Sequence, residues 1–367
     1  MTLDVRSLLA PGVESLGTYQ PGKPLSELTR EYGISGAIKL ASNENPLGPS
    51  ARALDAARAA LSDVARYPDS HGHALKQVLA GQLKVAAPQI TLGNGSNDVL
   101  ELVARTFLSE NDEVLISQHA FGMYELFVRA VGARTVVVPA YAWGHDLQAM
   151  QRAATARTRL VFIANPNNPT GTWTAKRDLV ELLRALPASV LVVVDEAYFE
   201  YVSELEYPDT ISMVASFPNL IVTRTFSKVH GLAGLRIGYG ISQADIAGYL
   251  DRVRQPFNVN SVAAAAAAAA LTDRDHVAVS VELNRKGMRQ LREGIEQLGL
   301  RYVPSVANFL AIDLGVAAAP VYEALLRRGV IVRPIASYGM PNHLRVTVGL
   351  PEENDRFLRT LRQVLPS

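Results

Sequence analysis

The residues best suited to chemistry lie in the stretch RTFSKVHGLAGLRIGYG, residues 224–240. Lys228 follows two hydroxyl residues, Thr225 and Ser227, and precedes Arg236 across a glycine-rich turn. Burial favours the neutral form of a lysine, and a neutral amine attacks aldehydes to form imines. The two hydroxyls and the guanidinium suit a phosphate dianion. An isolated lysine of this kind is more often a surface residue in a loop, so other motifs must support the chemical interpretation.

A second candidate anion site is the stretch GNGSND, residues 93–98, which is expected to open a helix directly after a strand. Backbone N–H groups at such a helix start bind anions, and Gly95 would let a phosphate approach closely. Ser96 and Asn97 can add side-chain donors. Taken alone, the stretch could equally be an ordinary N-capped helix, since it is neither a Walker loop nor a complete GxGxxG fingerprint.

Two further motifs offer groups that suit an aromatic ring with a basic nitrogen. Asp195 in VVVDEAY is expected at the end of a buried strand, where an unpaired carboxylate is costly. A protonated pyridine nitrogen would pair with it, and a ring kept cationic accepts electrons. Tyr198 and Asn168, the latter in ANPNNPTG with an expected cis bond to Pro169, can bond a phenolate oxygen. Phe121 can stack on the ring, although an aromatic residue there also suits the core.

Apolar runs that alternate with helical patterns would bring these residues together. We expect strands at residues 112–117, 134–140, 159–165, 189–198 and 219–227. Their continuous Val, Ile and Leu content indicates burial on both faces, as in a parallel sheet. Ligands of open α/β sheets bind at the carboxyl ends of the strands, so Asp195 and Lys228 are expected at that edge.

The pattern changes near residue 261, which indicates a second domain. A long helix is expected through residues 274–299, followed by short strands at FLAIDL, VIVRP and LRVTVG and by a terminal helix. The predicted fold class is α/β, with a large α/β/α domain over residues 36–260 and a smaller α+β C-terminal domain over residues 261–367. Residues 1–35 are expected to form an N-terminal arm that packs with the smaller domain.

Composition excludes several classes of function. The 367 residues include 36 Lys or Arg and 35 Asp or Glu, for a net charge of +1. This balance leaves no electrostatic footprint for nucleic acid or an anionic membrane. The lack of cysteine excludes disulfides, thiolate metal sites and cysteine catalysis, and no metal site is predicted. The N-terminus lacks the apolar core of a signal peptide, no run suits a membrane span, and we expect a cytoplasmic protein.

The chemical signals converge on one ligand, pyridoxal 5'-phosphate, which combines a phosphate, a phenolic oxygen, a pyridine nitrogen and an aldehyde. Almost end to end, the chain resembles the fold-type-I pyridoxal-phosphate aminotransferases, and within them the histidinol-phosphate branch. The motifs that carry the resemblance are YQPGKP, KLASNENPLGPS, YPD, GNGSNDVLEL, NPNNPTG, DEAY, TFSKVHGLAGLRIGYG, FNVNS, VIVRP and LRVTVG. The resemblance implies a seven-stranded, mostly parallel sheet in the large domain.

The resemblance also implies a role for each candidate residue. Lys228 would hold the cofactor as an internal aldimine and act with Asp195 and Tyr198 in catalysis, while Asn168 and Phe121 contact the ring. The residues implied at the phosphate are Ser96, Asn97, Thr225, Ser227 and Arg236, with Tyr67 from the other subunit of a homodimer. The residues implied at the substrate are Arg345, which anchors its acid group, together with Tyr19, Glu44 and Arg333.

The implied activity is transfer of the amino group of L-histidinol phosphate to 2-oxoglutarate in histidine biosynthesis, with ping-pong kinetics. An aromatic amino acid aminotransferase would use the same machinery, and a threonine-phosphate decarboxylase-like enzyme is a more distant alternative. A non-catalytic regulatory module would need a DNA-binding segment for which the chain has no spare residues. A nicotinamide enzyme would leave Lys228 unexplained and lacks the full glycine fingerprint.

Overall fold

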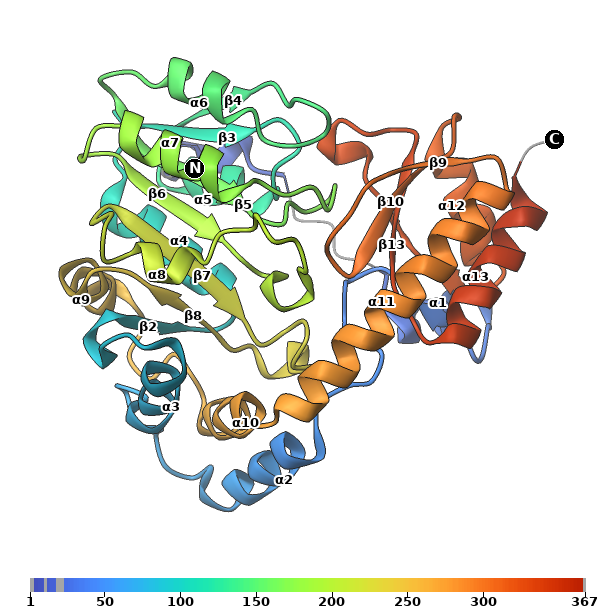
Figure 1. Ribbon diagram of the computed structural model, residues 1–367, viewed down its shortest axis with the longest axis horizontal. Coiled ribbons are helices and arrows are strands. Elements are labelled where there is room, and N and C mark those ends of the chain that lie inside the picture. The colour runs from blue at the N-terminus through green and yellow to red at the C-terminus, as the bar shows by residue number, and fades with distance from the viewer. Residues whose placement is uncertain (1–2, 10–11, 18–22, 366–367) are drawn as a thin grey trace.

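A seven-stranded sheet forms the centre of the larger part of the computed structural model (Figure 1). The structure describes residues 3–9, 12–17 and 23–365. The strands, in the spatial order β2-β8-β7-β6-β5-β3-β4, are β2 Ile90–Gly93, β8 Gly238–Ile241, β7 Leu220–Thr225, β6 Leu191–Asp195, β5 Thr158–Ala164, β3 Glu113–Ser117 and β4 Arg134–Val138. The strands from β7 to β4 pair in parallel, and β8 is antiparallel to both of its neighbours. The predicted, mostly parallel sheet is therefore confirmed.

The central parallel strands β3, β5, β6 and β7 coincide with the predicted apolar runs because both of their faces are covered, whereas the edge strand β4 leaves Val137 half exposed. Val192, Val193 and Val194 of β6 are all fully buried, as expected for a central parallel strand. The antiparallel strand β8 was not predicted, because its sequence GYGI contains two glycines and offers no continuous apolar run. Gly238 and Gly240 occupy places where helix α4 lies against the strand.

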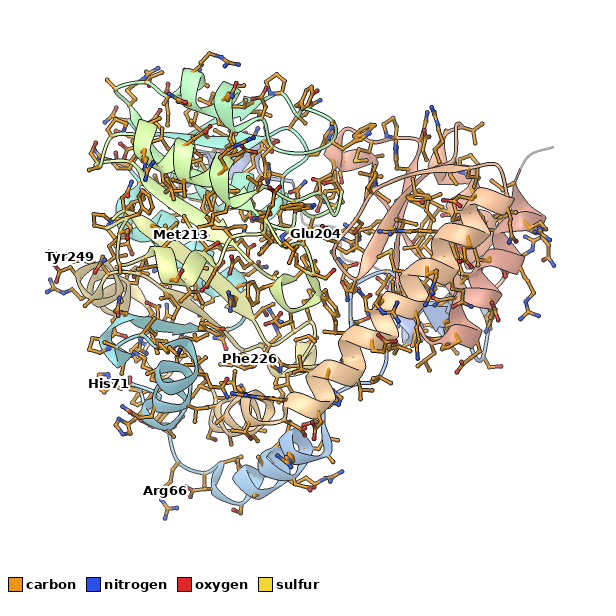
Figure 2. All side chains as sticks on the ribbon, viewed as in Figure 1. Arg66, His71, Glu204, Met213, Phe226 and Tyr249 are labelled. Atoms are coloured by element: carbon orange, nitrogen blue, oxygen red, sulfur yellow. The ribbon has the colours of Figure 1, made fainter. Side chains whose placement is uncertain are left out.

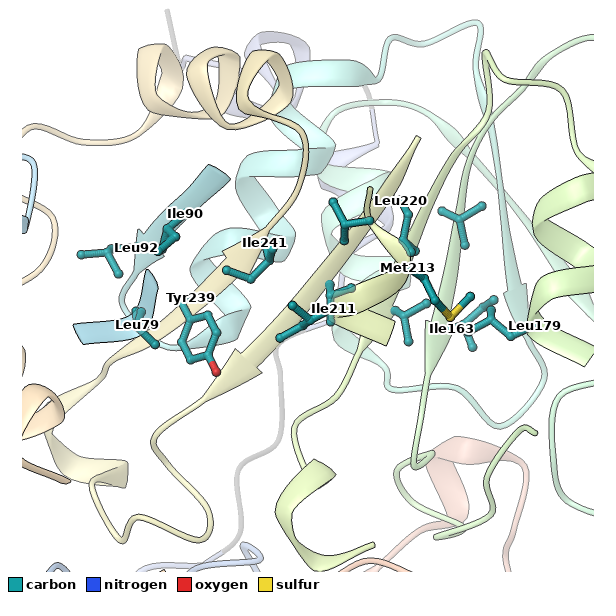
Figure 3. Packing of buried hydrophobic residues seen from close by; sticks show 14 of the residues in the cluster. Leu79, Ile90, Leu92, Ile163, Leu179, Ile211, Met213, Leu220, Tyr239 and Ile241 are labelled. Carbon is teal, nitrogen blue, oxygen red and sulfur yellow. The ribbon is translucent and has the colours of Figure 1, made fainter. Parts of the chain in front are cut away.

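Helices cover the two faces of the sheet separately. Those on one face are α4 Ser96–Phe107, α5 Met123–Ala130 and α9 Ala244–Val253, and those on the other are α6 Leu147–Ala153, α7 Lys176–Ala185 and α8 Thr210–Met213. Successive side chains of a strand point to opposite faces, so Phe162 of β5 joins the first cluster. Ile163 joins the second, where Leu179, Ile211 and Met213 lie near it (Figure 3).

Three helices pack together beside strand β2. They are α2 Ala51–Ala60, α3 His73–Leu83 and α10 Ser261–Thr272. The alanine-rich α10 buries Ala263, Ala266, Ala267 and Ala270 against α2 and α3. Because alanine side chains are small, the helices approach closely. Residues 261–272 therefore lie against the larger part of the molecule, while the domain boundary at residue 260 stays a prediction.

The C-terminal unit is built on an antiparallel sheet in the order β12-β13-β10-β9. Its elements are α11 Arg274–Gln297, β9 Arg301–Val303, β10 Phe309–Asp313, α12 Ala318–Leu326, β11 Val330–Ile331, β12 Arg333–Pro334, β13 His343–Thr347 and α13 Pro351–Val364. The expected long helix is α11. Asp273 caps its N-terminus, because the Asp273 side chain accepts a hydrogen bond from the backbone N–H of His276. Leu310, Leu344 and Phe357 are fully buried in the core of this unit.

An N-terminal segment completes the C-terminal unit. After helix α1 Leu25–Tyr32, strand β1 Ile38–Lys39 pairs in parallel with β11. The Leu40 N–H donates to Ile331 O at 2.7 Å, and the Thr347 N–H donates to Leu40 O at 2.9 Å. Residues 38–43 are therefore held by strands that follow them by about 300 positions in the sequence. Among the helices of the described residues, none is long and apolar enough to cross a membrane.

Gly238 provides a test of how tightly β8 packs on the start of α4. A Cβ at this position would lie 2.4 Å from the backbone nitrogen of Ser96 and 2.6 Å from the carbonyl carbon of Gly95. We expect Gly238→Ala to lower the free energy of unfolding by about 1–3 kcal/mol, because backbone atoms cannot move aside cheaply. Thermal unfolding measures the effect. Gly234→Ala is the matched control, since a Cβ there meets nothing within 4 Å, and equal melting temperatures for the two variants would contradict the expectation.

Candidate active site

A cavity of about 280 Å³ opens between the carboxyl ends of β5, β6 and β7 and the sheet of the C-terminal unit. Strands β6 and β7 point toward that unit in Figure 1. The volume lies close to the lower end of the roughly 300–1,000 Å³ typical of small-molecule sites. The predicted site residues that line the cavity are Glu44, Ser96, Asn97, Phe121, Asn168, Asp195, Tyr198, Thr225, Ser227, Lys228, Arg236, Arg333 and Arg345.

Lys228 follows the end of β7 and reaches the cavity with its amine. Its Nζ donates a hydrogen bond to Ser42 O at 3.0 Å and lies 5.6 Å from the centre of the Tyr198 ring. Burial, and then the positive charge of Arg345, lowers the pKa of Lys228 to about 7. A large share of the amine is therefore neutral at neutral pH, which is the nucleophilic form.

Asp195 ends β6 with its carboxylate almost completely buried. It accepts hydrogen bonds from the Tyr124 hydroxyl and from Thr223 Oγ1, both at 2.9 Å. Burial raises the pKa of Asp195, whereas these two hydrogen bonds and the charge of Lys228 act in the opposite direction. Sequence reasoning missed both donors. Thr223 could have been found by pairing β6 with β7, because it lies opposite Asp195 in the register.

The start of α4 and the turn after β7 form an anion-binding cup. Gly95 has a φ of +82°, and a Cβ on it would lie 2.6 Å from Arg236 Nη2. Arg236 donates through Nη1 to Ser227 Oγ and through Nη2 to Asn94 O, each at 3.3 Å. Together with Ser96, these groups surround the free N–H groups of a helix start with a guanidinium and hydroxyls, which suits a phosphate.

Tyr198 and Asn168 both line the cavity. Burial raises the pKa of Tyr198 to about 12, so its hydroxyl keeps its hydrogen at neutral pH. The Asn43 amide donates to the Tyr198 hydroxyl at 2.8 Å. The predicted cis bond between Asn168 and Pro169 is confirmed. Asn168 Oδ1 accepts a hydrogen bond of 2.5 Å from Arg345 Nη1.

Two arginines form a positive wall on the C-terminal side of the cavity. Arg333 of β12 and Arg345 of β13 lie directly opposite each other in the antiparallel pair. Arg345 Nη2 also donates to Ala41 O at 2.6 Å, which fixes its guanidinium plane. Glu44 lines the same cavity and accepts a 2.7 Å hydrogen bond from Lys39.

One predicted residue, Tyr67, is not among those that line this cavity. Tyr67 is 83% exposed and stacks on Phe257 with ring centroids 4.7 Å apart. Its neighbour Arg66 projects from the outer rim of the molecule near α2 (Figure 2). Tyr19 lies outside the residues that the structure describes. The role of Tyr67 in a second subunit stays a prediction.

The aromatic wall of the cavity contains one residue that sequence reasoning did not single out. Phe121 lines the cavity and meets Tyr124 edge to face, with centroids 5.7 Å apart. Tyr338 also lines it, and its carbonyl oxygen lies 2.6 Å from His119 Nδ1. In the described part of the chain, no cluster of three or more His, Asp or Glu side chains could hold a metal ion.

Comparisons with known proteins match the chain over nearly its whole length. The family model for aminotransferase class I and II matches residues 35–361. The chain is 57% identical over 367 residues to histidinol-phosphate aminotransferase 2 of Pseudomonas fluorescens, covering 100% of this chain and 99% of that protein. It is 56% identical over 364 residues to histidinol-phosphate aminotransferase 2 of Pseudomonas aeruginosa, covering 99% of each. The structure is similar to the crystal structure of histidinol-phosphate aminotransferase from Sinorhizobium meliloti in complex with pyridoxal-5'-phosphate, with a TM-score of 0.91, 31% identity and 98% coverage of each chain.

The lowered pKa of Lys228 predicts unusual amine reactivity. In protein freed of small molecules, acetylation of Lys228 should accelerate as pH rises through about 7, because only the neutral amine reacts. Site-resolved mass spectrometry measures the rate, with the exposed Lys286 as the control lysine. Arg345→Gln should move the midpoint to higher pH, because it removes a nearby positive charge. A Lys228 midpoint at or above that of Lys286 would contradict this prediction.

Proposed function

Because the chain belongs to the aminotransferase class I and II family, we propose that it is a cytoplasmic, pyridoxal-phosphate-dependent enzyme of histidine biosynthesis. It transfers the amino group of L-histidinol phosphate to 2-oxoglutarate. The observation that carries the proposal is that Lys228, Asp195 and the anion-binding cup line one cavity. Relatives of 56–57% identity that bear the name of histidinol-phosphate aminotransferase support the choice of donor.

The anionic end of pyridoxal 5'-phosphate suits the cup before α4. Ser96, Asn97, Thr225, Ser227 and Arg236 would hold the phosphate through hydroxyls, an amide and a guanidinium. Gly95 keeps the cup open, because a Cβ at this position would collide with the Arg236 guanidinium. The residues present therefore fit this part of the cofactor.

The ring of the cofactor suits the groups deeper in the cavity. Asp195 would hold the proton on the pyridine nitrogen, Tyr198 and Asn168 would bond the phenolic oxygen, and Phe121 would cover one face of the ring. When bound, the cofactor supplies an electron-accepting ring that stabilises negative charge on the adjoining carbon of the amino donor. The burial of Asp195 favours pairing with a protonated pyridine nitrogen, because a buried carboxylate is best compensated by a cation.

Lys228 would move the proton that the reaction requires. Burial lowers the pKa of its Nζ to about 7, so the neutral amine can accept the Cα proton of the donor as a general base and return it. A base is most effective when its pKa lies near the working pH. Both substrates would use the same cavity in turn, which gives ping-pong kinetics.

Arg345 and Arg333 would bind the acid groups of the substrates. A guanidinium offers a fork of N–H donors that fits both a phosphate monoester and a carboxylate. The wall formed by these two arginines can therefore accept the phosphate of the donor in one half-reaction and a carboxylate of the acceptor in the other. Glu44, which accepts a hydrogen bond from Lys39, stays a candidate for substrate binding, as does Tyr19.

A donor comparison tests the proposal. With 2-oxoglutarate as acceptor, kcat/KM for L-histidinol phosphate should exceed that for L-phenylalanine by at least about tenfold, because only the former carries a dianion for the arginine wall. Equal or faster turnover of phenylalanine would indicate an aromatic amino acid aminotransferase, and release of carbon dioxide from threonine phosphate would indicate a decarboxylase. Lys228→Ala should lower kcat by at least about 100-fold and abolish the borohydride-trappable visible chromophore; retention of both would refute the proposal.

We also propose a homodimer in which Tyr67 completes the phosphate site of the partner subunit. Its exposure motivates this arrangement, as does the fact that it does not line the cavity of its own subunit. Unfolding and refolding a mixture of Lys228→Ala and Tyr67→Ala chains should restore about a quarter of the wild-type sites, because about half of the dimers are mixed and each has one intact site. Activity at limiting cofactor concentration measures the restoration. No gain over the separate variants would mean that Tyr67 does not act across subunits.

A further inference from the structure

Asn43 is a buried residue next to the cavity to which sequence reasoning gave no role. It belongs to the motif ASNENPLGPS, of which only Glu44 was a candidate. Its side chain is 1% exposed, and its amide nitrogen donates to the Tyr198 hydroxyl at 2.8 Å. Its φ of +56° lies in the left-handed region, which asparagine adopts more readily than most residues.

Thr347 fixes which end of the Asn43 amide faces Tyr198. Thr347 Oγ1 accepts the backbone N–H of Asn43 at 2.9 Å and donates its own hydrogen to Asn43 Oδ1 at 3.1 Å. Thr347 gives its one hydroxyl hydrogen to Oδ1, and the NH₂ group of Asn43 points to Tyr198. Asn308 Nδ2 donates to Asn43 O at 3.0 Å and holds the segment from the other side.

The orientation of Asn43 determines what the Tyr198 hydroxyl can do. Because its oxygen accepts the Asn43 amide hydrogen, its own single hydrogen must point elsewhere. Tyr198 lines the cavity, and no bond donated by its hydroxyl to another described residue accompanies the one it accepts. The hydrogen is therefore available to a ligand in the cavity, and the raised pKa of Tyr198 keeps it in place at neutral pH.

We propose that Asn43 is a positioning residue that makes the Tyr198 hydroxyl a hydrogen-bond donor toward the cavity. The inference rests on the proposed function, in which the acceptor is the phenolic oxygen of pyridoxal 5'-phosphate. A hydrogen bond donated to an oxyanion stabilises it and lowers its basicity. Asn43 therefore tunes the acidity of the bound cofactor through Tyr198, and it does so from a segment anchored to Thr347 of the C-terminal unit.

Reversing the polarity of residue 43 tests the proposal. Asn43→Asp keeps the shape and tolerates the left-handed backbone, but its carboxylate accepts the Tyr198 hydrogen and draws it away from the cavity. In purified holoenzyme, the pH midpoint of the visible absorption of the cofactor should rise by about 1 pH unit, as in Tyr198→Phe. The Kd for pyridoxal 5'-phosphate, measured by equilibrium dialysis, should rise several-fold.

Asn45→Asp is the matched control for the added negative charge. Asn45 is also buried in this segment, but its amide donates to Val229 O and Ser280 Oγ rather than to Tyr198. Its variant should shift the midpoint much less than Asn43→Asp. In addition, Asn43→Asp should add almost nothing to Tyr198→Phe, whereas a through-space charge effect or a general loss of structure would persist in the double variant.

A second variant covers a failure of Asn43→Asp to fold. Asn43→Gly suits a positive φ and deletes the amide donor, so it should produce a smaller shift in the same direction. Unchanged midpoints in the folded variants, or a full additional shift in the Tyr198→Phe background, would overturn the inference and leave the proposed function intact. A wild-type protein with no visible chromophore at Lys228 would instead overturn the proposed function.

Discussion

Charge that is buried at the carboxyl edge of a parallel sheet must be compensated, and the whole candidate site follows from that constraint. Asp195 sits where β6 ends under the cavity and is met by hydroxyls from a helix and from the neighbouring strand. The same burial that raises the pKa of Asp195 lowers that of Lys228. The same buried environment therefore favours a cationic partner for the Asp195 carboxylate and allows the Lys228 amine to act as a nucleophile or a base.

The opposite face of the same two strands carries a buried ion pair. Because side chains alternate along a strand, Glu196 and Arg224 point away from the cavity, while their neighbours point into it. Arg224 donates to Glu196 Oε2 through Nε at 2.9 Å, and its Cζ lies 3.4 Å from the centre of the Phe199 ring. The pair joins the carboxyl ends of β6 and β7, next to Asp195 and Thr225. It therefore helps to fix the positions of these two residues relative to each other from the opposite face of the sheet.

Sequence patterns predicted the fold class and most of the residues around the cavity, but not their mutual contacts. Continuous apolar runs located the parallel strands, and the residue types in GNGSND, DEAY and the lysine motif indicated which groups face a ligand. Tyr124 and Asn43 were missed because each acts on a residue 71 or 155 positions away, and no local pattern encodes such a contact. The glycine-rich β8 was missed because its role is to leave space for α4, which a hydrophobic pattern does not reveal.

The pairing of β1 with β11 has a consequence for synthesis of the chain on the ribosome. Ser42, Asn43 and Glu44 border the cavity, yet the segment that carries them is anchored to Ile331 and Thr347. The seven-stranded sheet can assemble once residue 241 has emerged from the exit tunnel, since domains fold as units during translation. The cavity wall at residues 41–44 must wait until Ile331 and Thr347 have also emerged, so the site becomes complete only after the larger sheet can form.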